Sequence, residues 1–331
     1  MRLARPWLAI AVVTAMALPF QNCSENLGER MDEASSNSTA SPSPSPSPSP
    51  SPSPPSNLPN KASISLGSVS RSPSAGLIGT SYTAKAFLSA SKTVTATIRF
   101  TAVDATGVPR SFRELKGQIM GTSAVEYSAV FPSTASWPNG IYRVRVEVID
   151  ESDSTTLYTN QNVTTFSSAA PIRVVAGSTR TYVDSAGNSW APDQGFSGGY
   201  TEDPDVVTYP ITGTADPFLY RGLRWGQDPT TGATAPFTYT FTVPAPGKYA
   251  VTLKWNEHYV TGPNQRYFGV NINGQSVIEN TFDLFAAAGG MFIPYDRTFT
   301  ITATGTEVVI EFVPGAIENP KIDAIEVKGA P

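Results

Sequence analysis

The sequence predicts an all-β protein with two β-sandwich domains and no long helix. Between residues 237 and 243 aromatic side chains alternate with threonine, and between 249 and 255 large apolar side chains alternate with smaller or polar ones. A period of two places one row of side chains against a core, as in a half-buried strand. Between 62 and 167 about seven short strand-like runs are separated by turn residues, a spacing typical of a sandwich.

Composition narrows the chemistry that the chain can perform. Its 331 residues are 40% hydrophobic and 15% charged, which is enough for two soluble domains. A net charge of −4, without a basic cluster interleaved with aromatics, argues against a nucleic-acid partner. One cysteine excludes an intramolecular disulfide, and one histidine excludes most zinc sites and histidine-based catalytic arrangements. We therefore expect no cofactor, no metal and no nucleic acid.

The N-terminus has the features of an export signal, which we assign to residues 1–23. Two arginines precede an apolar run over residues 7–18, which is too short to span a bilayer. The run ends close to Cys23, and the segment resembles a bacterial lipoprotein signal, in which this cysteine becomes the lipidated first residue. The alternatives are ordinary cleavage after Ala15-Met16-Ala17 and a free surface thiol at Cys23. The resemblance implies a membrane anchor and an outer-membrane lipoprotein that faces the periplasm or the cell surface.

Residues 24–60 are predicted to be a disordered linker. They are poor in large apolar side chains, and Ser-Pro dipeptides repeat from 41 to 54, so the segment cannot bury a core. Proline-rich chain is extended and rises ~3.1 Å per residue, which gives the Ser-Pro run a reach of roughly 40 Å. The linker is either a spacer that holds the domains away from a membrane or a simple connection without a set reach.

The middle domain is predicted to be a sandwich over residues 61–168. Strand-like runs cover residues 81–88, 93–101, 125–131 and 141–149, and in the last run the even positions from Tyr142 are apolar while Arg143, Arg145 and Glu147 are charged. Residues 137–142 (WPNGIY) resemble the turn and returning strand of bacterial immunoglobulin-like repeats. That resemblance implies an immunoglobulin-like domain with a spacer or packing role.

In the C-terminal domain we expect residues 249–255 and 265–272 to form a hairpin, since Asn273-Gly274 follows as a strong turn signal. The loop over residues 257–263 then lies at the open end of the sandwich. It carries Tyr259 at a place that a ligand can reach.

This part of the chain resembles the malectin domain, a carbohydrate-binding β-sandwich. The matching blocks occur in the family's order and extend the likeness over residues 171–328. They are 172–177 (IRVVAG), 218–226 (FLYRGLRWG), 253–259 (LKWNEHY), 268–274 (FGVNING), 282–285 (FDLF) and 318–322 (ENPKI).

The resemblance implies that a sugar lies among loops at one end of the sandwich, held by aromatic rings and an acidic residue. Matched position by position, the carbohydrate-binding residues are Tyr200, Trp225, Tyr259 and Glu318. The second of two adjacent aromatics in the family is Val260 here, and the family's aspartate is Glu318.

The residue types suit a sugar independently of the likeness. A pyranose stacks its C–H faces on aromatic rings and needs a few fixed polar groups for its hydroxyls. Large aromatics that follow the alternation of a strand more often lie in the core, and we assign Trp255, Phe268 and Phe241 to the core.

Glu257 and Glu318 could form the carboxylate pair of a glycosidase. Glu257, however, belongs to the framework motif of a non-catalytic family, so we expect no enzyme activity.

The sequence thus predicts an exported, lipid-anchored protein of the cell envelope whose malectin-like domain binds a glucose-containing oligosaccharide. The alternative is a structural or adhesive cell-surface protein whose sandwiches contact protein partners and whose sugar pocket has been lost at Val260.

Overall fold

The computed structural model describes residues 60–331 and is almost entirely β-structure, which confirms the predicted all-β class. Within these residues the only helical segments are the 3-10 turn η1 (Pro217–Tyr220) and the short helix α1 (Leu284–Ala288). No helix of this part of the chain is long and apolar enough to cross a membrane. The predicted signal segment with Cys23 and the Ser-Pro run lie outside the described residues.

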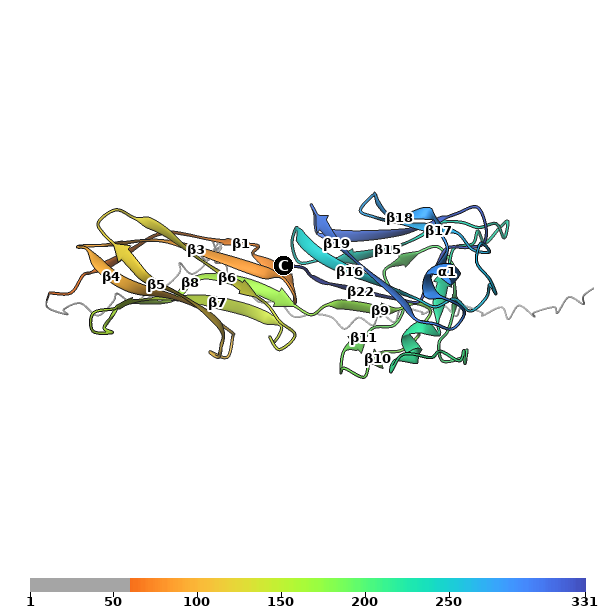
Figure 1. Cartoon of the computed structure of the whole chain (residues 1–331), viewed down its shortest axis with the longest axis horizontal. Helices are drawn as coiled ribbons and strands as arrows, with labels where there is room; N and C mark the ends of the chain where they lie inside the picture. The colour runs from red at the N-terminus through yellow and green to blue at the C-terminus, as the bar shows by residue number, and fades with distance from the viewer. Residues whose placement is uncertain (1–59) are drawn as a thin grey trace, which may run out of the picture. The chain divides into compact units, whose positions relative to one another are not determined.

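The first sandwich consists of a three-stranded sheet, β1-β3-β6, and a five-stranded sheet, β2-β8-β7-β4-β5 (Figure 1). Its strands are β1 (Ile64–Ser72), β2 (Ala75–Leu77), β3 (Ser81–Ala90), β4 (Val94–Val103), β5 (Pro109–Met120), β6 (Val125–Pro132), β7 (Gly140–Asp150) and β8 (Thr156–Ala169). In β7 the predicted alternation is confirmed, because Tyr142, Val144 and Val146 are buried in the core between the sheets. The Tyr142 hydroxyl donates to the Pro138 carbonyl and fixes the turn that enters this strand.

The second sandwich consists of a five-stranded sheet, β12-β15-β20-β17-β18, and a four-stranded sheet, β19-β16-β22-β9 (Figure 1). Its strands are β9 (Ile172–Val175), β12 (Phe196–Ser197), β15 (Phe237–Thr242), β16 (Gly247–Trp255), β17 (Phe268–Ile272), β18 (Gln275–Phe282), β19 (Tyr295–Ala303), β20 (Glu307–Pro314) and β22 (Ala324–Gly329). The core between the two sheets contains Trp255, Phe268 and Phe241, as predicted.

The predicted hairpin between residues 249–255 and 265–272 is wrong. β16 pairs with β19 and β22, whereas β17 pairs with β18 and β20 in the other sheet. Both strands bury an apolar row in the same core, but they do so from opposite sides. The hairpin at Asn273-Gly274 joins β17 to β18. The segment between β16 and β17 therefore crosses from one sheet to the other, over one end of the sandwich.

Short strands complete the second domain. β10 (Tyr182–Val183) pairs with β11 (Ser189–Trp190), and β14 (Leu223–Trp225) lies between β13 (Tyr200–Glu202) and β21 (Lys321–Ile322). In that three-stranded sheet Tyr200 is opposite Trp225, and Glu202 is opposite Leu223. Paired residues share a face of a sheet, as do residues two apart along a strand. These four side chains consequently share one face of the sheet, and all of them except Tyr200 line the candidate site.

Candidate functional site

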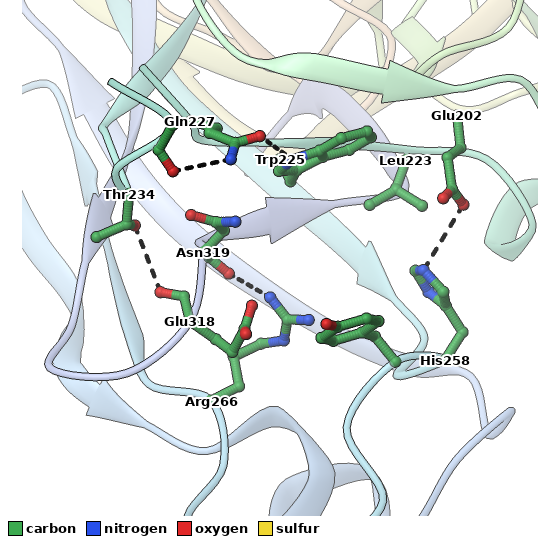
Figure 2. Close-up of a pocket in the computed structure, with 11 residues that line it drawn as sticks. Glu202, Leu223, Trp225, Gln227, Thr234, His258, Arg266, Glu318 and Asn319 are labelled. Atoms are coloured by element: carbon green, nitrogen blue, oxygen red, sulfur yellow. Dashed lines mark hydrogen bonds and ion pairs between the residues drawn. The ribbon is translucent and has the colours of Figure 1, made fainter. Parts of the chain in front are cut away.

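A pocket with a volume of about 540 Å³ lies where the small sheet β13-β14-β21 meets the segment between β16 and β17. It is lined by two large aromatic rings, two carboxylates and several other polar groups. The lining residues are Glu202, Leu223, Trp225, Gln227, Gly232, Thr234, His258, Tyr259, Arg266, Glu318 and Asn319. Figure 2 shows Glu202 and His258 on one side of the pocket, and Thr234, Glu318 and Asn319 on the other.

The two rings are presented in different ways. Trp225 is half-buried, stacks on Tyr200 at a centroid distance of 5.8 Å, and its Nε1 lies 3.4 Å from Gln227 Oε1. The side chain of Tyr259 is exposed, with 66% of its surface accessible. Both rings offer apolar surface beside polar groups, which is the combination that a sugar ring requires.

A buried carboxylate holds the loop that carries Tyr259. Oε1 of Glu257 accepts hydrogen bonds from the backbone N–H groups of His258, Tyr259 and Val260 at 3.0, 3.0 and 3.2 Å. Its Oε2 accepts from Arg266 Nε at 2.8 Å. Burial raises the pKa of Glu257, but the nearby cations and these hydrogen bonds outweigh burial and hold the pKa below its usual value. Both oxygens are therefore engaged in positioning the loop.

A second buried cluster, around Lys321 of β21, contacts the pocket residue His258. The ammonium of Lys321 is fully buried, donates to the Asn256 carbonyl, and lies 3.1 Å from Asp323 Oδ1 and 3.1 Å from His258 Nδ1. Burial raises the pKa of the Asp323 carboxyl even with this cation beside it. Lys321 is thus part of the framework that orients His258.

The opposite wall is the turn before β21. Glu318 has a positive φ of 60°, which few residues other than glycine and asparagine adopt without strain. Its carbonyl accepts from the Thr234 hydroxyl at 3.4 Å, and the Asn319 carbonyl accepts from Arg266. Within residues 60–331 the Glu318 carboxylate has no ion pair. It is available to a ligand in the pocket.

The C-terminal domain has recognisable relatives. Residues 171–325 match the family model of the malectin domain. Malectin-B of Xenopus laevis is 27% identical over 126 residues, which cover 34% of this chain and 42% of that protein. Malectin of Mus musculus is 30% identical over 125 residues, which cover 34% of this chain and 40% of that protein. The chain thus spans about two fifths of the length of these curated relatives.

A solved structure with a broader but weaker likeness is the β-glucuronidase of Bacteroides uniformis. The similarity covers 78% of this chain and 28% of that one, at 16% identity and a TM-score of 0.41. Such a distant likeness supports no statement about function. The match to the malectin domain, in contrast, confirms the resemblance predicted for the C-terminal domain.

The pocket brings together three of the four residues predicted to contact sugar, namely Trp225, Tyr259 and Glu318. Tyr200 is absent from the lining but stacks on Trp225 and remains 41% exposed. Their roles in binding stay predictions. Val260 is only 5% exposed and is also absent from the lining. The missing second aromatic of the malectin domain thus falls at a buried position.

Eight lining residues were not among those predicted, and they include Glu202, Gln227, His258 and Arg266. Glu202 could have been found, because it lies two residues after Tyr200, and alternate strand residues share a face. Arg266 could not, since only the fold brings it to Glu257. Among residues 60–331 no group of three or more His, Cys, Asp or Glu residues could hold a metal ion.

Proposed function

We propose that the malectin domain of this protein binds a neutral, glucose-containing oligosaccharide without cleaving it. The observation that carries this proposal is the pocket in which Trp225 and Tyr259 lie beside Glu202 and Glu318. Rings take up the C–H faces of a pyranose, and carboxylates accept hydrogen bonds from its hydroxyls. The match of residues 171–325 to the malectin domain supports the same ligand class.

The position of Glu257 argues against one route to catalysis. The carboxylate pair considered from the sequence was Glu257 with Glu318, but Glu257 is fully buried and is not in the pocket lining. A general acid or nucleophile must reach the glycosidic oxygen or the anomeric carbon. Glu257 instead accepts hydrogen bonds from the backbone of the loop that carries Tyr259.

For the rest of the chain we propose a lipid anchor at Cys23, a Ser-Pro spacer, and a stalk formed by the first sandwich, at an outer membrane. The stalk is proposed to be immunoglobulin-like. Its sheets of three and five strands and the bond from the Tyr142 hydroxyl to the upstream Pro138 carbonyl support this, since such domains carry a tyrosine of this kind at the start of one strand.

The test is titration of the full chain with nigerose and maltose, followed by calorimetry or NMR, with product analysis after long incubation. Two stacking rings contribute about 1 kcal/mol each beyond area burial, so we expect dissociation constants in roughly the micromolar to millimolar range. Intact sugar should be recovered. Absence of binding to these sugars and to a glycan array would favour the alternative, a structural or adhesive protein. Val260 gives that alternative little support, because it lies outside the pocket lining.

A further inference from the structure

His258 is held in one protonation form at the pocket wall. Its side chain is 8% exposed and its ring stacks on Tyr209 at a centroid distance of 4.5 Å. Nδ1 lies 3.1 Å from the Lys321 ammonium. An ammonium can only donate hydrogen bonds, so Nδ1 must be the acceptor and the proton of the neutral ring is on Nε2. The side chain therefore presents an N–H donor toward the pocket.

That donor faces an acceptor across a gap. His258 Nε2 lies 3.7 Å from Glu202 Oε2, and both residues line the pocket (Figure 2). This separation is too long for a direct hydrogen bond, and in the described part of the chain Nε2 makes none. The Tyr209 hydroxyl donates to Glu202 Oε2 at 2.9 Å. Tyr209 thus positions both groups, one by stacking and the other by its hydroxyl.

The gap fits one hydroxyl oxygen. Such an oxygen can accept from Nε2–H at about 2.9 Å and donate to Oε2 at about 2.7 Å, and two such bonds span 3.7 Å with an angle near a right angle at the oxygen. An ether or methoxyl oxygen cannot donate, an ammonium cannot accept, and a carboxylate would be repelled by Glu202. Only a group that both accepts and donates satisfies both partners.

We propose that Glu202 and His258 together recognise one free hydroxyl of the bound sugar. This proposal rests on the proposed function and makes it more specific. The site discriminates a neutral glycan with that hydroxyl free from its deoxy, O-methylated or uronic acid counterpart. A nearly buried donor left without its acceptor makes such discrimination strong.

The experiment uses the full chain with nigerose and maltose and their mono-deoxy and mono-O-methyl derivatives. At one hydroxyl of the sugar, both its removal and its O-methylation should weaken binding to the wild type by about tenfold or more. In Glu202→Ala the parent sugar should bind correspondingly more weakly, and the same derivatives should bind as well as the parent. Tyr209→Phe, which removes only the hydroxyl that positions Glu202, should lose part of the discrimination.

A matched control and a direct readout complete the design. Glu279→Ala removes an exposed carboxylate of β18 outside the pocket and should leave every affinity unchanged. His258 is the only histidine of the chain, so its Nε2–H signal in NMR is unambiguous. This signal should shift when the parent sugar binds and stay unshifted with the deoxy derivative that binds weakly. If the parent sugar binds but its advantage in affinity over every derivative is unchanged in Glu202→Ala, the inference is overturned and the proposed function stands. If no glucoside binds the wild type, both are overturned.

Discussion

Tyr259 and Trp225 line the same pocket but differ in how much of the fold they support. We expect Tyr259→Ala to weaken glucoside binding at least about tenfold while changing the free energy of unfolding by less than about 0.5 kcal/mol, since the ring is exposed. Trp225→Ala should weaken binding as strongly but also destabilise the domain by about 1 kcal/mol, because it removes a ring stacked on Tyr200. Titration calorimetry and urea unfolding measure the two quantities.

The control for these substitutions is Phe112→Ala, which removes a ring that is 60% exposed on β5 of the first sandwich. It should change neither quantity. Collapse of the fold in Tyr259→Ala would contradict the assignment of that ring to the ligand site.

His258 should make the protein sensitive to acid. Burial, aided by Lys321 and Arg266, lowers the pKa of this ring from 6.5 to about 2 in the folded chain. Between these pH values the unfolded chain binds a proton on this ring that the folded chain excludes. Stability is therefore lost as the pH falls below 6.5, at about 1.4 kcal/mol per pH unit for this one group. Asp323 acts in the opposite direction, because its raised pKa makes the folded chain the better proton acceptor.

The comparison that isolates this effect is wild type against His258→Asn in urea unfolding at pH 7.5, 6.5, 5.5 and 5. Asp323 contributes to both proteins, so its effect largely cancels in the difference. The stability advantage of the wild type should shrink by about 2 kcal/mol between pH 6.5 and 5. A constant difference, or an imidazole NMR signal that titrates near pH 6.5, would show that the ring takes up a proton in the folded state.

The residue types of the site could be predicted from sequence in part. Trp225, Tyr259 and Glu318 lie in blocks that resemble a known family, and the structure brings them to one pocket. The sequence predicted no role for His258 or Arg266, because their contacts are with buried partners. Their neighbours Lys321 and Glu257 are 63 and 9 residues away along the chain. Such pairing follows from tertiary contacts that no local pattern records.

At the scale of the element, the loop between β16 and β17 depends on one carboxylate. Glu257→Gln leaves Arg266 buried without its ion pair, which should destabilise the domain by about 3 kcal/mol. It also weakens the hydrogen bonds to the three amides of residues 258–260, since the acceptor loses its charge. Urea unfolding and hydrogen exchange at those amides measure the two effects, and exchange there should become faster.

The control is Glu279→Gln, which makes the same chemical change at an exposed position of β18. Unchanged exchange at residues 258–260 in Glu257→Gln would mean that the loop is held by other contacts. In that case the position of Tyr259 would not depend on the buried carboxylate.

The same element shows where prediction from pattern ends. The apolar alternation in residues 249–255 and the turn at Asn273-Gly274 were enough to predict β16 and the end of β17. They were not enough to predict which strands pair, because a half-buried strand shows the same alternation in either sheet of a sandwich. The predicted hairpin failed for that reason. The actual crossover is what carries Tyr259 over the end of the sandwich.

For the whole molecule, a fragment of residues 171–331 should fold alone and unfold cooperatively. Its two sheets enclose a core that contains Trp255, Phe268 and Tyr249, as an independent domain requires. Circular dichroism with urea unfolding would measure this, and its glucoside affinity should equal that of the full chain. Aggregation of the fragment, relieved only when residues 62–168 are included, would show that the predicted domain boundary is wrong.

The last prediction concerns the proposed anchor at Cys23. If this cysteine carries lipid, Cys23→Ser should move the protein from the membrane fraction to the soluble fraction. Two or more acyl chains give stable membrane attachment, each buried methylene contributing about 0.8 kcal/mol. Cell fractionation measures the distribution, and Ser24→Ala is the matched control because it leaves Cys23 unchanged. A membrane fraction unchanged in Cys23→Ser would exclude lipid at this residue, whereas glucoside binding by the released protein should equal that of the wild type.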